Sequence, residues 1–192
     1  MPATSEIPTA AQRAVSRLRE LEQISDRPDC LSRSLHSDAN LRAARLILEW
    51  MEELGMETAH TRDGSVRGIL KGSNPDAAPV LVGSHFDTVI DAGLYDGPLG
   101  IISALAAIET LCERGIELPF PVHVLGFSDE EGSRIQTTCV GSRGPRMRCP
   151  ATRGSRSICV TARTASRLEC RWSCSKRSPS SRPDATSLYG TS

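Results

Sequence analysis

Hydrophobic positions recur with a helical period in two stretches near the start of the chain. Apolar side chains stand three residues apart from Val15 to Ile24, which predicts an amphipathic helix over residues 11–24. A second such pattern begins at Ser37 and stops at Gly55, a residue suited to the position after a helix end. The pattern therefore predicts two surface-packed helices before any strand.

The pattern then changes to short strands alternating with one long apolar helix. Residues 56–61, 65–70 and 79–85 are β-like, and Pro79–Val82 has the composition of a buried strand. A mostly apolar helix is predicted from Pro98 to Gly115, and an apolar run over residues 122–131 ends in three consecutive carboxylates. This order of elements predicts an α/β sandwich with at least one parallel crossover.

Charge divides the chain into two parts at Arg143. Residues 1–143 carry 13 Lys and Arg against 21 Asp and Glu, whereas residues 144–192 carry 10 against 2. The second part also holds 10 serines and only four residues of the types Leu, Ile, Val and Phe. So few large aliphatic side chains cannot offset the entropy of ordering the chain. We therefore expect a folded domain over residues 1–143 and a disordered or poorly packed basic tail over residues 144–192.

Composition excludes some classes of protein. No apolar run approaches the roughly 20 residues that a membrane-spanning helix needs, and the first residues lack the features of a secretory signal. The seven cysteines are odd in number and irregularly spaced, which favours free thiols over a disulfide framework. The sequence thus predicts a cytoplasmic protein with no membrane partner.

Two polar segments follow predicted buried strands, where ligands usually bind in open α/β sheets. The first, residues 83–97, contains His85, Asp87, Asp91 and Asp96, and the second, residues 127–134, contains the acidic run Asp129–Glu131. Imidazole and carboxylate groups are ligands that zinc or manganese accepts. Either segment alone is more often an ordinary polar loop, but three adjacent acids after a strand usually need a cation or a shared proton.

These two segments carry a family resemblance. GSHFDTVIDAGLYDGPLGI, followed about thirty residues later by FSDEEGSR, resembles the M20-type metallo-amidohydrolases, in particular the allantoate amidohydrolase and N-carbamoyl-L-amino acid hydrolase branch. The resemblance covers roughly residues 12–143, and VIDAGLYDG is closer to the allantoate enzymes. It implies a partial catalytic domain, with a sheet flanked by helices, that hydrolyses a linear ureido C–N bond of a small molecule in purine catabolism. N-carbamoyl-L-amino acids are the alternative substrate.

The resemblance also implies a role for each polar residue. His85 would be a terminal ligand of one of two divalent ions, manganese or zinc, and Asp96 would bridge both. Glu131 would be a carboxylate ligand, and Glu130 the general base that takes a proton from the attacking water. Asp87 would accept the second imidazole N–H of His85 and so fix its tautomer.

The sequence departs from the family after Arg143. The family supplies two further histidine ligands and a dimerisation domain, but no histidine follows His123 here. We interpret the tail as the product of a changed reading frame, and so expect weak or no activity from this chain. A basic arm for nucleic acid and a zinc site at the four tail cysteines are the competing interpretations, and we expect no nucleic-acid partner. A non-catalytic metal-binding or interaction fragment is the alternative of another class.

Overall fold

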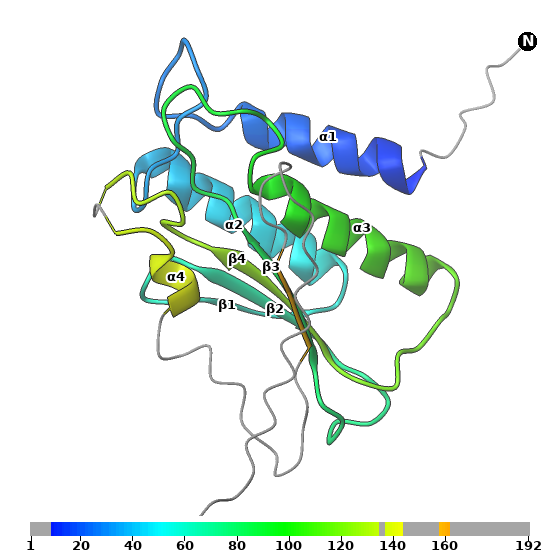
Figure 1. Cartoon of the computed structure of the whole chain (residues 1–192). Coiled ribbons are helices and arrows are strands. Elements are labelled where there is room, and N and C mark those ends of the chain that lie inside the picture. Colours follow the sequence, from blue (N-terminus) through cyan, green and yellow to red (C-terminus); the bar gives the residue numbers. More distant parts are fainter. Residues whose placement is uncertain (1–8, 135–136, 144–157, 162–192) are drawn as a thin grey trace, which may run out of the picture.

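The computed structural model describes residues 9–134, 137–143 and 158–161, and the elements alternate much as the sequence predicts (Figure 1). The helices are α1 (Ala10–Glu22), α2 (Asp38–Glu53), α3 (Pro98–Glu113) and the short α4 (Val140–Arg143). The strands are β1 (Glu57–His60), β2 (Val66–Leu70), β3 (Val80–His85), β4 (Val122–Phe127) and β5 (Ile158–Thr161).

Side chains and proline set the helix starts. The Thr9 hydroxyl accepts the amide of Gln12, whose own side chain caps Thr9 in return, and the Ser37 hydroxyl accepts the amide of Asn40 at the start of α2. Pro98 occupies the first turn of α3, where its missing N–H costs no hydrogen bond. The helix boundaries predicted from the sequence are therefore confirmed to within two residues.

The sheet is mixed, with strand order β1-β2-β4-β3-β5. β1 and β2 pair antiparallel, as do β2 and β4, whereas β3 is parallel to both β4 and β5. The connection from β3 through α3 to β4 is the predicted parallel crossover. Its register places His85 opposite Phe127, so the polar segments that follow these two strands leave the sheet side by side.

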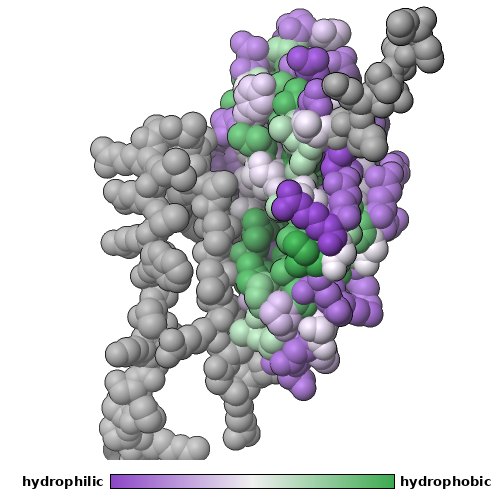
Figure 2. Space-filling view, turned by 90° about the vertical axis from the view of Figure 1, so that its right-hand side faces the viewer, coloured by the Kyte–Doolittle hydropathy of each residue, from purple (hydrophilic) through white to green (hydrophobic). Residues whose placement is uncertain are grey.

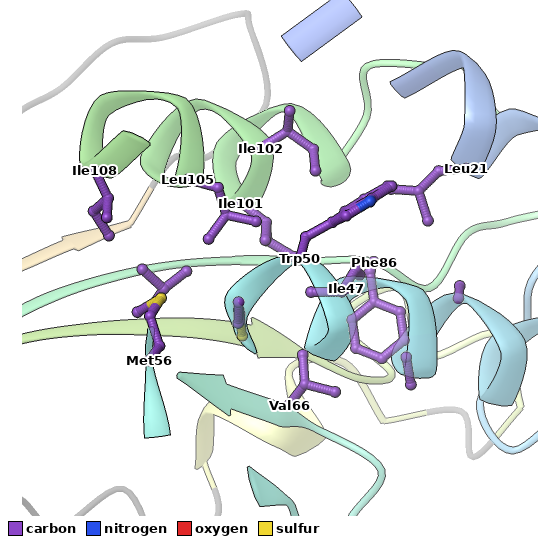
Figure 3. Packing of buried hydrophobic residues seen from close by; sticks show 14 of the residues in the cluster. Leu21, Ile47, Trp50, Met56, Val66, Phe86, Ile101, Ile102, Leu105 and Ile108 are labelled. Atoms are coloured by element: carbon purple, nitrogen blue, oxygen red, sulfur yellow. The ribbon is translucent and has the colours of Figure 1, made fainter. Parts of the chain in front are cut away.

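Helices α1, α2 and α3 lie on one side of the sheet, with α1 packed on the outside of α3 (Figure 1). Between them is a core in which Trp50 and Ile47 of α2 meet Ile101 and Leu105 of α3 above Val66 (Figure 3). Each of these five side chains is at most 5% exposed. The α/β class with a sheet flanked by helices is thus confirmed.

Ion pairs hold α1 against α3. Arg13 lies 3.0 Å from Glu109 and 2.7 Å from Glu113, and Arg17 lies 3.4 Å from Glu109.

On the side of the molecule shown in Figure 2, hydrophilic residues surround a smaller group of hydrophobic ones. None of the helices in the described part of the chain is long and apolar enough to cross a bilayer.

Helix α4, over Val140–Arg143, is the last described element before the predicted boundary. Within the predicted tail the structure describes only the backbone of β5, paired with Val80–Gly83 of β3. The predicted state of residues 144–157 and 162–192 lies outside the described residues and stays a prediction, as does the division into two parts.

Candidate metal centre

Two strand ends bring together side chains that stand far apart in the sequence. Ligand atoms of His85, Glu130 and Glu131 all lie within 4.8 Å of one another. His85 ends β3 and is 7% exposed, while the two glutamates follow β4 and are half-buried. One imidazole and two carboxylates at this separation are a donor set that a divalent cation can use.

Asp96 approaches the same imidazole from the start of α3. Its Oδ1 lies 3.7 Å from His85 Nε2, is itself buried and has no hydrogen-bond partner in the described part of the chain. A buried carboxylate oxygen without a partner is costly, and a bound cation would remove that cost. The residues therefore fit a metal ion, and Asp96 fits as a further ligand.

Gly97 allows the His85 imidazole to lie close to the backbone that follows Asp96. Its φ is +89°, and a Cβ there would stand 2.5 Å from His85 Cε1 and 2.7 Å from the His85 carbonyl oxygen. Only glycine combines this backbone conformation with so close an approach. The DG pair at positions 96 and 97 thus supplies both a carboxylate and the space for the ring beside it.

Asp87 connects the two strand ends. Its carboxylate is fully buried, and its oxygens accept the amide of Glu130 at 3.1 Å and the amide of Glu131 at 3.3 Å. The nearest partner of His85 Nδ1 is the backbone carbonyl of Asp87, at 3.0 Å, and the Asp87 carboxylate lies 3.6 Å away. The residue therefore orients the ring chiefly through its backbone, while its carboxylate holds the acidic segment.

Burial and neighbouring charged groups shift the pKa values of Glu131 and His85. Burial raises the pKa of the Glu131 carboxyl, and although His85 opposes this, Asp96 and Glu130 add to it. Burial lowers the pKa of His85, but the hydrogen bonds and charge of Asp87, with Glu130, outweigh it and raise the pKa to about 9. A cation in this cluster would relieve the repulsion among its carboxylates.

We predict that metal affinity rises with pH across the neutral range. In the metal-free chain the His85 ring is protonated below about pH 9, which stabilises the fold fully below about 6.5 and progressively less up to 9. Because a metal needs the neutral ring, binding must release this proton, so the apparent Zn²⁺ association constant should rise about tenfold from pH 7 to pH 8. Calorimetry in buffers of different ionisation enthalpy measures the proton release. An association constant that does not change between these pH values would contradict the prediction.

Two polar residues near the cluster have different surroundings. The Nη1 of Arg134 donates to the Leu35 carbonyl at 2.7 Å. Asp129 is fully buried, and among the described residues neither of its carboxylate oxygens has a hydrogen-bond partner. Burial and the nearby charge of Asp87 accordingly raise the pKa of Asp129.

Two contacts of the site have no clear signal in the sequence. The Cys139 thiol donates to Glu130 Oε1 at 3.6 Å, and its amide donates to the Glu130 carbonyl at 3.0 Å. Arg33 lies buried behind the β3 end, where its Nε donates to the Phe86 carbonyl at 3.2 Å. Cys139 lies close to the acidic segment in sequence, but nothing near Arg33 in the sequence points to the site.

A cluster of imidazole and carboxylates at the ends of two parallel strands is typical of metal-dependent hydrolases. Comparison with known proteins agrees with this class. Residues 65–153 match the family model described as Peptidase family M28. The chain is 47% identical over 131 residues to allantoate deiminase 2 of Glycine max, which covers 67% of this chain and 27% of that protein. It is 36% identical over 133 residues to the N-carbamoyl-L-amino acid amidohydrolase of Geobacillus stearothermophilus, covering 69% of this chain and 32% of that protein.

A solved structure shows the same fold. The hydantoinase/carbamoylase family amidase of Burkholderia ambifaria superimposes with a TM-score of 0.65 at 30% identity, over 69% of this chain and 33% of that one. This chain is therefore part of a Peptidase M28/M20-like amidohydrolase domain, as its two strand-end motifs predicted. It spans about a quarter to a third of the length of these relatives.

Proposed function

We propose that this chain supplies the first metal-binding segments of an enzyme that hydrolyses a linear ureido C–N bond, with allantoate as the substrate. The observation that carries the proposal is the meeting of His85, Glu130 and Glu131 within 4.8 Å in a chain of this family. Identity to an allantoate deiminase, 47%, exceeds identity to an N-carbamoyl-L-amino acid amidohydrolase, 36%, and this difference favours allantoate.

His85, Asp96 and Glu131 would hold two divalent ions, zinc or manganese. Bound there, the ions would supply Lewis-acid chemistry, since they lower the pKa of water and polarise a carbonyl oxygen. Glu131 shares the cluster with His85, and the buried Oδ1 of Asp96 lies 3.7 Å from the same imidazole. Zinc and manganese both accept this mixed nitrogen and oxygen set.

Glu130 would be the general base. Its carboxylate would accept a proton from the attacking water and donate it to the departing ureido nitrogen. Two contacts support this role: the Asp87 carboxylate fixes its backbone, and the Cys139 thiol contacts its Oε1. A carboxylate held in this way is positioned for proton transfer without having to reorganise.

The activity of the chain by itself is a separate proposal. The matched segment covers only 27% and 32% of these two relatives, and this sequence has no histidine after His123 that could complete a two-metal ligand set. We therefore expect little ammonia release from the 192-residue chain alone.

A cytoplasmic location, a homodimeric whole protein and a place in purine catabolism remain predictions from the sequence. So does the alternative of a non-catalytic metal-binding fragment.

We predict that residues 12–143 can replace the corresponding segment of an allantoate deiminase. A chimaera with the Glycine max enzyme as host should keep allantoate hydrolysis within about tenfold of the host, because the segment brings His85, Asp96 and both glutamates as one unit. Ammonia release at saturating Mn²⁺ measures it.

A second chimaera tests the alternative substrate. The same segment placed in the Geobacillus N-carbamoyl-L-amino acid amidohydrolase should lose considerably more activity, because this host is only 36% identical over the replaced region. A segment that functions in the carbamoylase host and not in the deiminase host would reverse the substrate assignment. Failure in both hosts, with both chimaeras folded and loaded with metal, would overturn the enzymatic proposal and favour the non-catalytic alternative.

A further inference from the structure

Arg33 is a cation buried inside the fold. It lies between α1 and α2 and is 1% exposed, the largest of the fully buried side chains in the described residues. A charge without hydrogen bonds in such a place would be strongly destabilising. The fold compensates with backbone carbonyls, because Nη1 donates to Leu21 at 2.5 Å and to Ile24 at 3.3 Å, and Nε donates to Phe86 at 3.2 Å.

Two of these carbonyls belong to the end of α1. Leu21 lies in the last turn, and Ile24 follows the C-cap residue Gln23. Helix C-terminal carbonyls lack partners within the helix and carry partial negative charge, so a guanidinium there is favourable. Arg33 therefore links the end of α1 to the residues that its other donors bind.

The remaining donors bind the loop that follows β3. Besides the bond to Phe86, the Arg33 amide donates to the Thr88 hydroxyl at 2.8 Å, and the Thr88 amide donates to the Arg33 carbonyl at 3.0 Å. These three bonds fix the residues on both sides of Asp87. The charge is also complementary, since burial lowers the pKa of Arg33 to about 10 while the carboxylates of Asp87 and Asp26 oppose that shift.

Asp87 carries this restraint into the metal centre. It is fully buried, it accepts the amides of Glu130 and Glu131, and its carbonyl accepts the imidazole of His85. A single residue thus contacts the three groups whose ligand atoms lie within 4.8 Å of one another. Any displacement of the Asp87 loop would move all three.

We propose that Arg33 is a positioning residue of the metal centre: it holds the Phe86–Thr88 loop so that Asp87 keeps His85, Glu130 and Glu131 in register. The proposal rests on the proposed function only for the identity of the ligands. It does not require Arg33 to touch metal or substrate. The competing explanation is that Arg33 stabilises α1 and nothing more.

Matched variants of the 192-residue chain separate these explanations. Arg33→Met keeps an unbranched apolar stem and removes the donors and the charge. Arg17→Met is the control. Arg17 lies on α1 and, like Arg33, is mostly buried; it pairs with Glu109 and stacks at 5.6 Å on Trp50. None of its contacts in the described residues involves the site. Both changes should lower the midpoint of thermal unfolding, so stability alone does not distinguish them.

Two further measurements distinguish the variants. In the metal-free chain, Arg33→Met should speed hydrogen exchange of the Thr88, Glu130 and Glu131 amides, and Arg17→Met should leave these amides unchanged. With metal, Arg33→Met should weaken Zn²⁺ binding by about 10- to 100-fold, as changes outside the ligand shell commonly do. It should also change the visible spectrum of bound Co²⁺, which reports coordination geometry.

A milder variant guards against failure to fold. Thr88→Val keeps the volume of the side chain and removes only the bond from the Arg33 amide, so it should change exchange and affinity in the same direction by a smaller factor. Wild-type exchange at Glu130 and Glu131 in both site variants would overturn the proposal. A wild-type chain that binds no metal would overturn the metal centre instead, and the exchange of these amides would still decide the role of Arg33.

Discussion

Replacing His85 with alanine is expected to remove most of the affinity of this chain for zinc or manganese. The imidazole is the only nitrogen ligand in the cluster with Glu130 and Glu131, and its Nε2 faces the unpartnered oxygen of Asp96. Changes outside the ligand shell already cost about 10- to 100-fold in metal affinity, so the loss of a ligand should cost at least about 100-fold. Calorimetric titration with Zn²⁺ in the presence of a competing chelator measures this loss.

His60→Ala is the matched control for this change. His60 is exposed at the end of β1 and shares no contact with the cluster. Its variant should bind Zn²⁺ as the wild-type chain does, which would exclude non-specific binding by surface histidines. Equal affinities of the His85 and His60 variants would mean that the metal binds elsewhere.

The sequence predicted the elements well because their signals are local. Ser37 marks the start of α2 through a bond to an amide three residues on, and Pro98 marks the start of α3 through its own ring. The parallel pairing of β3 with β4 also follows from local information, since a single helix separates the two strands.

Strand order was not predictable in this way. β2 lies beside β4 and antiparallel to it, although some fifty residues separate the two strands in sequence. The packing of Met51 and Met56 against the space that Gly68 leaves open helps to fix β2 there. Such a contact depends on side chains of α2 and of the residue before β1 meeting a glycine of β2, and no periodic pattern records it.

Some residues of the candidate site were likewise predictable from the sequence, and others were not. His85, Asp96 and the glutamates follow apolar strands or precede a helix, so sequence alone identifies them as candidates. The role of Asp87 was harder to predict, because its carboxylate bonds to amides more than forty residues away and its carbonyl takes the bond expected for the carboxylate. Arg33 lies in a loop with no regular pattern, and only the folded structure shows that it is buried behind Asp87.

Glu130→Gln, made in the chimaera with the Glycine max allantoate deiminase, is expected to abolish ammonia release while leaving metal bound. Glutamine keeps the shape of the side chain and the backbone amide that bonds to Asp87, but its amide cannot accept a proton. Loss of a general base commonly costs about 10²- to 10⁴-fold in rate. The measurement pairs ammonia release from allantoate with the metal content of the same purified sample.

The metal content distinguishes a base from a ligand. Glu130 lies in the same cluster as His85 and Glu131, so geometry alone allows it either role. Glu131→Gln is the paired variant: it should lose bound metal and activity together, because an amide is a weaker ligand than a carboxylate. If Glu130→Gln also lost its metal, Glu130 would be a ligand and the base would have to be another group. If it kept both metal and full turnover, Glu130 would have neither role, since the water would then lose its proton without this carboxylate.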